Sequence, residues 1–111
     1  MSVPPELRWP VRRFRVRDTS MQPALRPGDR LLVTTWARPR PGDVVVFRDP
    51  EATRTLTVKR VQALTPEGSL IVLGDNPNVS RDSRHFGPVA RSLIVGRAVY
   101  RYLPGPRRGG L

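Results

Sequence analysis

The turn sequence Arg-Pro-Gly-Asp occurs twice in this chain, at residues 26–29 and 40–43, and a short apolar run follows each copy. Proline and glycine at the two central positions favour a type II turn, because proline restricts φ and glycine tolerates a positive φ. The apolar runs that follow, Leu31-Leu-Val33 and Val44-Val-Val-Phe47, have the length of strands. The chain is therefore expected to consist of short strands that reverse direction at tight turns.

Apolar runs and alternating patterns extend this expectation to the whole chain. They predict six strands, at residues 14–17, 30–35, 43–48, 55–64, 69–73 and 93–102, with almost no helical periodicity. We predict an all-β fold, mostly β with short helical turns, that forms a compact and barrel-like core. The 111 residues suffice for one domain, which we place at 13–103 between a flexible lead-in at 1–12 and a flexible tail at 104–111.

The charge and the residue types argue against several classes of function. The formal net charge of +11 would suit nucleic acid, an anionic membrane or an acidic protein, but the arginines are scattered and no nucleic-acid motif accompanies them. We therefore expect no nucleic-acid partner. The chain has no cysteine and one histidine, so we expect no disulfide, no metal site and no cofactor.

Membrane insertion is not expected from the sequence. No apolar run has the length of a transmembrane helix, and the first residues contain no hydrophobic signal core. The expectation is a soluble, cytoplasmic protein whose oligomeric state the sequence leaves open. Trp9 and Trp36 are interpreted as packing residues, although a peripheral membrane contact stays open for both.

Lys59 is the only lysine among the 20 basic residues of the chain. Arginine stays protonated at any working pH, whereas a lysine can lose its proton when it is desolvated. Because side chains alternate along a strand, Thr57, Lys59 and Val61 share one face, and Val58 and Arg60 share the other. Lys59 can therefore point to a partly apolar interior and act as a base. Codon usage in a GC-rich genome, with a snorkelling edge lysine, would explain the same composition without chemistry.

Ser20 supplies the second half of the chemical interpretation. It lies in a tight polar turn within Asp18-Thr-Ser-Met-Gln-Pro-Ala-Leu-Arg-Pro-Gly-Asp29. A turn serine and a buried lysine together indicate a Ser/Lys hydrolase, a variant of the triad in which lysine is the base. A Ser-His-Asp site would have to use His85, the only histidine, which lies in a loop beside Phe86. We favour the pair Ser20 and Lys59.

Four segments of the chain occur in an order that resembles a known family. They are Ser20-Met21-x-Pro23-x-Leu25 with Gly28-Asp29, then Gly42-Asp-Val-Val-Val-Phe47, then Val58-Lys-Arg-Val61, and finally Gly74-Asp-Asn76 with Ser80-Arg-Asp-Ser-Arg84, Phe86-Gly87 and Ile94-Val-Gly-Arg-Ala98. Together they resemble the type I signal peptidase family of Ser/Lys endopeptidases, over residues 14 to about 100. The resemblance implies a mostly β catalytic core of the signal peptidase and LexA type.

The resemblance also implies roles for individual residues. Ser20 matches the nucleophile, Lys59 the general base, and Ser80 the serine whose hydroxyl orients the lysine amine. Asp82 and Arg84 match an acid and a base that brace the loop around the active site.

The oxyanion hole is less completely defined by the resemblance. Some relatives have a hydroxyl two residues before the nucleophile, where this chain has Asp18. Asp18 is expected either to point away, or to leave the oxyanion to the Ser20 backbone N–H and a second donor such as Thr19.

The strand at residues 14–18 runs directly into Ser20, so it is well placed to pair with an extended substrate by strand addition. The candidate substrate contacts are Phe14, Val16 and Met21. The alternative is that this strand is an internal member of the sheet.

The function predicted from these observations is that of a serine endopeptidase acting on a precursor protein with an N-terminal leader. Among the branches of the family, the chain most resembles the maturation protease of nickel-type superoxide dismutase, which removes the leader of the dismutase precursor. Two alternatives are a self-cleaving regulator of the LexA type and a peptidase for another exported or membrane-associated precursor. A non-catalytic basic β-module that binds nucleic acid is disfavoured, because the aromatic content is only 6%.

Overall fold

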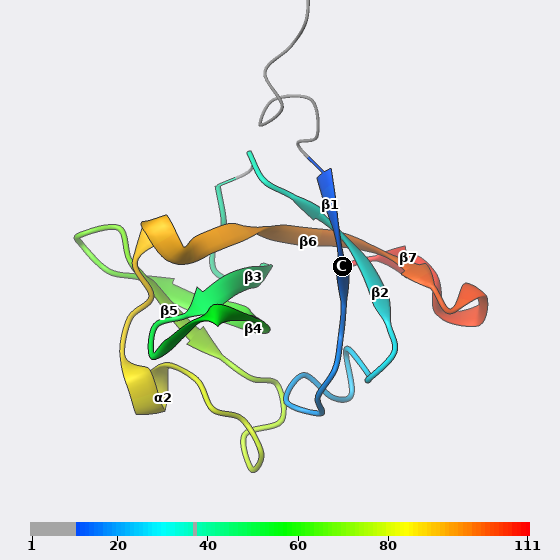
Figure 1. Cartoon of the computed structure of the whole chain (residues 1–111), viewed down its shortest axis with the longest axis horizontal. Coiled ribbons are helices and arrows are strands. Elements are labelled where there is room, and N and C mark those ends of the chain that lie inside the picture. Colours follow the sequence, from blue (N-terminus) through cyan, green and yellow to red (C-terminus); the bar gives the residue numbers. More distant parts are fainter. Residues whose placement is uncertain (1–10, 37) are drawn as a thin grey trace, which may run out of the picture.

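The computed structural model describes residues 11–36 and 38–111, which form one antiparallel sheet with very little helix (Figure 1). The order of the strands across the sheet is β1-β2-β6-β3-β4-β5, and β7 also pairs with β6. The strands are β1 (Val11–Arg15), β2 (Arg30–Thr34), β3 (Val44–Asp49), β4 (Ala52–Leu64), β5 (Leu70–Leu73), β6 (Ile94–Leu103) and β7 (Gly109–Gly110). The helical turns are α2 (Ser83–Phe86), η1 (Arg91–Leu93) and η2 (Gly105–Arg107).

The structure confirms the predicted fold class and corrects the predicted barrel shape. β1 and β5 lie at opposite ends of the strand order and do not pair with each other, so the sheet is not closed into a barrel. An open sheet leaves one edge of β1 free of a partner strand within the described residues.

The six predicted strands all appear, with differences at the two ends of the chain and at β4, which begins at Ala52 instead of residue 55. The first strand spans Val11–Arg15 instead of 14–17, so two residues of the predicted lead-in belong to the sheet, while residues 1–10 lie outside the described part. The predicted tail at 104–111 contains η2 and β7, and β7 pairs with β6 through Tyr100↔Gly110 and Arg101↔Gly109.

The repeated Arg-Pro-Gly-Asp sequence forms the same turn in both places. Gly28 and Gly42 have φ values of 93° and 95°, which side-chain-bearing residues rarely adopt. Each aspartate accepts a hydrogen bond from the backbone N–H of the arginine three residues earlier, at 2.9 Å for Asp29 and 2.8 Å for Asp43. These turns therefore direct the chain into β2 and β3.

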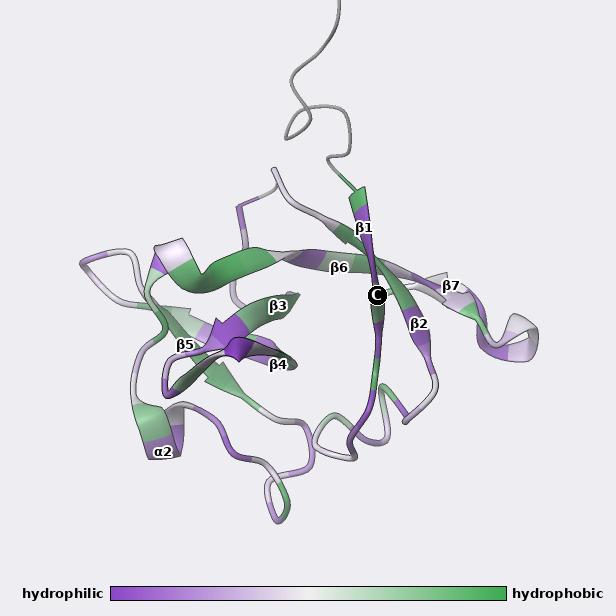
Figure 2. Ribbon diagram, in the orientation of Figure 1, coloured by the Kyte–Doolittle hydropathy of each residue, from purple (hydrophilic) through white to green (hydrophobic). Residues whose placement is uncertain are grey.

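Two hydrophobic clusters pack against opposite faces of β3. Val44 and Val46 belong to one cluster, and Val45 and Phe47 belong to the other. The first cluster also contains Val16, Met21, Leu25, Leu31, Val33, Val58 and Ala98; the second also contains Val61, Leu70, Val72 and Val89. Figure 2 shows the corresponding hydrophobic stretches along β3, β5 and β6. Burying each of the side chains larger than alanine contributes about 1.5–3 kcal/mol, so the clusters fix the position of β4 beside β3.

A buried aspartate connects the turn before β2 with the C-terminal part of the chain. Asp29 is 1% exposed and accepts hydrogen bonds from Arg101 at 3.1 Å and from Arg107 at 3.0 Å. Arg101 also donates to the carbonyl oxygen of Ala24 at 2.8 Å. This ion-pair cluster holds the segment that follows Ser20 against β6 and η2.

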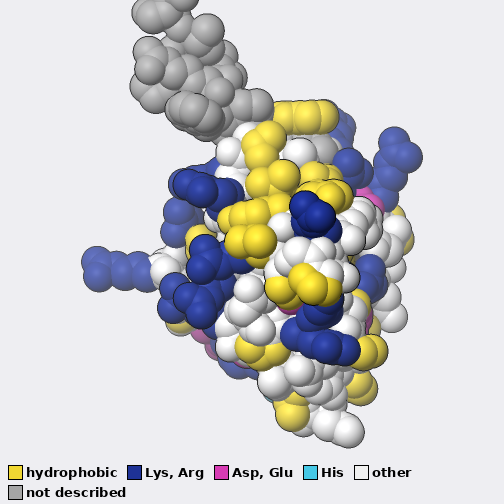
Figure 3. Space-filling view, turned by 90° about the vertical axis from the view of Figure 1, so that its right-hand side faces the viewer, with side chains coloured by type: hydrophobic (Ala, Val, Ile, Leu, Met, Phe, Trp, Pro, Cys, Tyr) yellow, Lys and Arg dark blue, Asp and Glu magenta, His cyan; other side chains and the backbone are white. Residues whose placement is uncertain are grey.

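The surface combines scattered basic side chains with exposed apolar ones. Figure 3 shows arginine side chains spread over one face among apolar groups, without a single basic stripe. Trp36 is 68% exposed, so it is not the packing residue that the sequence suggested, and Trp9 lies outside the described residues. In the part of the chain that the structure describes, no helix has the length and apolar character needed to cross a bilayer.

Candidate active site

Ser20 lies in a tight turn between β1 and β2 whose apolar side chains anchor it to the core. The backbone N–H of Leu25 donates to the carbonyl oxygen of Met21 at 2.9 Å, and both side chains are fully buried. The carbonyl oxygen of Ser20 accepts the backbone N–H of Asn76 at 2.8 Å, and the Asn76 amide donates to the carbonyl oxygen of Thr19 at 3.2 Å. Ser20 itself is 3% exposed, so its hydroxyl has a fixed and protected position.

Lys59 reaches Ser20 from the middle of β4. Its Nζ lies 2.7 Å from Ser20 Oγ and 3.5 Å from Thr57 Oγ1, and the residue is 2% exposed. The neighbouring Arg60 points to the other face, where it makes a two-pronged ion pair with Asp75 at 2.9 and 2.8 Å. The alternation that the sequence predicted for these two basic residues is therefore present.

The surroundings of Lys59 favour its neutral form. Burial is the largest influence and lowers the pKa of the ammonium below its ordinary value. The negative charges of Asp18, Asp82 and Asp49 raise this pKa, in that order of strength, and the positive charge of Arg81 lowers it. Because burial outweighs the carboxylates, Lys59 is more easily deprotonated than an exposed lysine.

Asp82 organises the loop between β5 and α2. Its side chain is fully buried and accepts hydrogen bonds from Arg84 Nε and Nη2 at 2.9 Å, from the Gly74 N–H at 2.9 Å and from Ser80 Oγ at 2.7 Å. Burial alone would raise the pKa of this carboxyl, but the donors of Arg84, Gly74 and Ser80 hold it well below its usual range. Asp82 and Arg84 are therefore in direct contact, and the bracing role that the resemblance implied for them stays a prediction.

Ser80 donates its hydroxyl to Asp82, and among the described residues no hydrogen bond joins it to Lys59. The hydrogen bonds of the Lys59 amine within the described residues go to Ser20 and Thr57. A serine oxygen that donates to a carboxylate keeps lone pairs that can still accept from an amine. The orienting role of Ser80 stays a prediction, and Thr57, to which the sequence analysis gave no role, is the observed second partner.

Gly74 leaves space that the site requires. A Cβ at this position would lie 2.1 Å from Ser80 Oγ and 2.7 Å from the carbonyl oxygen of Ser20. Only a residue without a side chain lets the loop approach the Ser20 turn this closely. The Gly74-Asp-Asn76 segment therefore joins the Ser20 turn to the loop that carries Ser80 and Asp82.

The Asp18 carboxylate points toward Ser20, in contrast to the expectation that it could point away. Its Oδ1 accepts the backbone N–H of Ser20 at 3.0 Å and the hydroxyl of Ser20 at 2.8 Å. The Ser20 N–H, predicted as an oxyanion donor, is thus already engaged. Thr19, the other predicted donor, is exposed and carries the carbonyl that binds Asn76.

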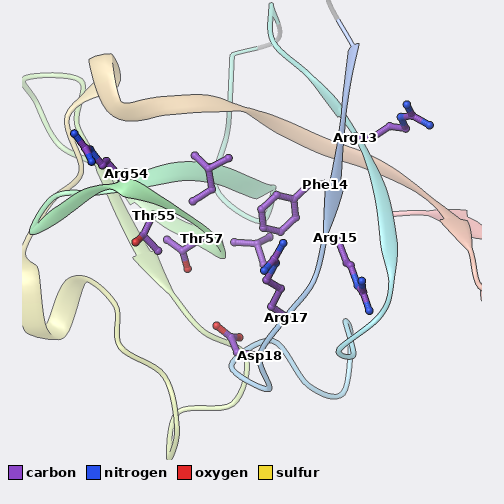
Figure 4. Close-up of a pocket in the computed structure, with 10 residues that line it drawn as sticks. Arg13, Phe14, Arg15, Arg17, Asp18, Arg54, Thr55 and Thr57 are labelled. Carbon is purple, nitrogen blue, oxygen red and sulfur yellow. The ribbon is translucent and has the colours of Figure 1, made fainter.

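A groove with a volume of about 460 Å³ lies beside the Ser20 and Lys59 pair. Figure 4 shows Phe14 and Arg17 on one side of it and Thr55 and Thr57 on the other. The lining comprises Arg13, Phe14, Arg15, Arg17, Asp18, Arg54, Thr55, Leu56, Thr57 and Val58. Asp18 and Thr57 are the lining residues that also bind Ser20 and Lys59, so the groove opens beside the pair.

Among the predicted substrate contacts, only Phe14 lines this groove. Val16 and Met21 are fully buried members of the first hydrophobic cluster, because the tight turn at Ser20 folds their side chains into the core. His85 serves α2: its Nδ1 accepts the backbone N–H of Asp82 at 3.2 Å, as part of the capping box of that turn. No group of histidine, cysteine, aspartate and glutamate side chains suited to a metal ion occurs among the described residues.

Comparisons with known proteins identify the family of this chain. Residues 9–67 and 62–103 match the family described as Signal peptidase, peptidase S26. The chain is 33% identical to the mitochondrial ATP-independent inner membrane protease subunit 1b of Arabidopsis thaliana, over 77% of this chain and 66% of the relative. It is 30% identical to the mitochondrial inner membrane protease subunit 2 of Saccharomyces cerevisiae, over 85% and 69% of the two chains. It is 29% identical to the probable signal peptidase I-1 of Synechocystis sp., over 86% and 73%.

The chain spans only part of its relatives, covering 54% of the length of the related subunit 1a of Arabidopsis thaliana. The family match nevertheless extends over most of this chain, from before β1 to the end of β6. It includes the turn of Ser20, the strand of Lys59 and the loop of Asp82. The chain therefore belongs to the signal peptidase family of serine peptidases, peptidase S26.

Proposed function

We propose that this protein is a serine endopeptidase that removes an N-terminal leader from a precursor protein, with Ser20 as nucleophile and Lys59 as general base. The observation that carries the proposal is the 2.7 Å contact between the Lys59 amine and the Ser20 hydroxyl, both of which are buried. A buried lysine with a lowered pKa is the base that such a serine needs.

The reaction divides into acylation and hydrolysis. In acylation the neutral Lys59 amine takes the proton of Ser20 Oγ, the oxygen bonds to the carbonyl carbon of the scissile peptide, and the π electrons move to the carbonyl oxygen. The intermediate then collapses, the C–N bond breaks, and the departing amine of the mature protein takes the proton from the Lys59 ammonium. In hydrolysis a water gives a proton to Lys59 and its oxygen bonds to the carbonyl carbon of the leader ester. The bond between that carbon and Ser20 Oγ then breaks, Oγ takes the proton from the Lys59 ammonium, and the leader leaves with a new carboxyl group.

The surrounding residues would support these steps without reacting themselves. Asp82 and Arg84 hold the loop that packs against the Ser20 turn, and Ser80 stands beside Gly74 within this loop. The extended leader would lie in the groove beside Phe14, whose strand has a free edge there.

The test is the processing of a leader-bearing precursor by the purified protein, followed by intact-mass spectrometry. Ser20→Ala and Lys59→Arg are each expected to lower the rate by 100-fold or more, roughly the scale of losing a nucleophile or base. Ser92→Ala, which changes an exposed serine in η1, is the matched control and should keep the full rate. A folded Ser20→Ala protein that still processes the precursor would exclude the assignment.

For the substrate, we propose the precursor of a nickel-type superoxide dismutase, processed in the cytoplasm. This narrower proposal is supported by the resemblance of the sequence to the maturation protease of that system. Co-expression of the protein with such a precursor, and with a precursor that carries a secretory signal peptide, would separate the two substrate classes. Processing of the second precursor alone would contradict the dismutase proposal and leave the peptidase assignment intact.

A further inference from the structure

Asp18 occupies both hydrogen-bond donors of the nucleophile. Its Oδ1 lies 3.0 Å from the Ser20 nitrogen and 2.8 Å from Ser20 Oγ. An ionised carboxylate only accepts hydrogen bonds, so the serine proton must lie on the Asp18 side of the oxygen. Lys59 Nζ then meets the same oxygen, at 2.7 Å, as a donor. In this arrangement the proton that the base has to remove points away from the base.

We propose that Asp18 is a positioning residue that latches Ser20 in a resting state, and that a peptide bound in the groove opens the latch by displacing the Asp18 carboxylate. This inference rests on the proposed function of Ser20 and Lys59. It adds a step in which substrate binding itself releases the nucleophile.

A peptide in the groove can reach the Asp18 carboxylate, and this carboxylate has to move before Ser20 attacks. The carboxylate is exposed and lines the groove, so a peptide in the groove meets it directly (Figure 4). When Ser20 attacks, negative charge develops on the carbonyl oxygen, which a backbone N–H would stabilise and a neighbouring carboxylate would repel. Asp18 must therefore release the Ser20 N–H before the attack. Arg17 and Arg54 line the same groove and supply positive charge for the displaced carboxylate.

Asp18 also acts on the base through its charge. Burial lowers the pKa of Lys59, and Asp18 is the strongest of the charges that oppose this effect. The other charges around Lys59 come from different elements: Asp82 before α2, Arg81 in the same loop, and Asp49 at the end of β3. These stay in place when Asp18 is changed. Removing the Asp18 charge therefore lowers the pKa of Lys59 further and increases the fraction of neutral amine near pH 7.

The first experiment compares the wild type with Asp18→Asn, which keeps the side-chain shape and a carbonyl acceptor but removes the charge. The measurement is kcat/KM on a leader peptide from pH 6 to 10. In Asp18→Asn we expect the rising part of the pH profile of kcat/KM to move to lower pH by about half to one unit. We expect kcat/KM at pH 7 to increase roughly threefold to tenfold over the wild type. Asp18→Ala, which removes both hydrogen bonds, should move the rising part in the same direction.

The matched control is Asp43→Asn. Asp43 caps its own turn by accepting the backbone N–H of Arg40 at 2.8 Å, and it is not among the charges that act on Lys59. Its variant should leave the pH profile unchanged. A loss of kcat in Asp18→Asn, with the midpoint of its pH profile unchanged, would show that Asp18 only stabilises the turn by capping the Ser20 N–H. This result would overturn the latch.

The second experiment does not depend on activity. Because Lys59 is the only lysine, protein labelled with ¹³C-lysine gives a single set of lysine side-chain NMR signals, whose titration reports the pKa of Lys59. We expect a lower pKa in Asp18→Asn than in the wild type and in Asp43→Asn. Equal titrations in all three proteins would overturn the inference even if the enzyme is active. A wild type that cuts no leader peptide would contradict the proposed function, while the titration would still decide whether Asp18 controls Lys59.

Discussion

At the scale of single residues, Lys59 combines a structural cost with a chemical use. A lysine that is 2% exposed has lost most of its hydration, and within the described residues its amine gains only hydroxyl partners, Ser20 and Thr57, in return. Burial of an amine without a directly bound carboxylate disfavours its charged form. The same property that destabilises the fold therefore prepares the amine to act as a base.

This cost predicts a pH dependence of stability. The folded-state pKa of Lys59 is lowered, so the unfolded chain binds more protons between the folded pKa and the ordinary value of 10.5, and stability rises with pH in that window. Lys59→Met removes the titration while keeping a long apolar side chain. The free energy of unfolding, measured with urea at pH 6 to 10.5, should rise in the wild type relative to Lys59→Met as the pH increases. Parallel curves for the two proteins would show that Lys59 is not desolvated in solution.

The lowered pKa of Asp82 predicts that stability is lost as the pH falls into the acid range. Its folded-state pKa is depressed, so its contribution to stability is present above the ordinary value of 3.8 and is lost as the pH falls below it. Asp82→Ala should cost about 2–4 kcal/mol at pH 7, because it leaves the buried N–H of Gly74 without a partner. The difference from the wild type should shrink in unfolding experiments at pH 3. Asp75→Ala, which breaks a partly exposed pair with Arg60, is the control and should cost about 1 kcal/mol or less.

At the scale of elements, the backbone N–H groups of Val16 and Arg17, which follow the end of β1, point to opposite edges of the sheet. The N–H of Val16 donates to the carbonyl oxygen of Asp29 at 2.9 Å, so it points toward the β2 side. Because N–H groups alternate between the two edges of a strand, those of Arg15 and Arg17 point to the free edge. The groove lies along this segment and provides room for a paired peptide.

Proline substitutions test this difference. Val16→Pro removes an internal hydrogen bond and should lower the melting temperature clearly. Arg17→Pro removes a donor for which no partner occurs among the described residues, so it should keep the melting temperature and raise KM if a substrate uses this donor. Arg17→Ala controls for the loss of the side chain, and a normal KM for Arg17→Pro would show that the peptide does not pair with this edge.

Most of the sheet could be predicted from the sequence, because its strands carry their own signals. The Pro-Gly turns and the apolar runs of β2 to β6 identify those strands directly. β7 consists of two glycines and has no side-chain pattern, so only its pairing with β6 reveals it. Whether the sheet closes depends on how far β1 and β5 lie apart, and no local pattern encodes that separation.

The candidate site also contains features that the sequence predicts and features that it does not. Ser20 and Lys59 could be predicted because their residue types and surroundings indicate one chemistry. The contact of Asp18 with Ser20 depends on how the polar turn folds, and that of Ser80 with Asp82 depends on the loop around Gly74. Such contacts follow from tertiary structure, which is why residue types alone left them open.

At the scale of the whole molecule, the C-terminal segment contributes to the fold near the active site. Arg107 in η2 binds the buried Asp29, which also holds Arg101 and the segment after Ser20. Removing one of two cationic partners leaves a buried carboxylate only half neutralised. The end of the chain is thereby connected to the turn that carries the nucleophile.

Arg107→Ala should therefore destabilise the protein although it lies far along the chain from Ser20. We expect a cost of roughly 1 kcal/mol, which corresponds to a fall of about 4 °C in melting temperature for a chain of this size. Arg108→Ala is the matched control, because its side chain binds only the nearby carbonyl of Gly105 among the described residues and should leave the melting temperature unchanged. Equal melting temperatures for the two variants would show that the ion-pair cluster does not reach η2 in solution.

The single lysine also gives the molecule one internal site for a sequence-specific protease. An endoproteinase that cuts only after lysine has one target bond in this chain, between Lys59 and Arg60 in the middle of β4. In the folded protein β4 is paired on both sides, with β3 and with β5, so the bond becomes accessible only when the centre of the sheet opens. Cleavage into two fragments would therefore record the opening of the sheet centre directly, without a spectroscopic label, and every variant that retains Lys59 could be compared on the same bond.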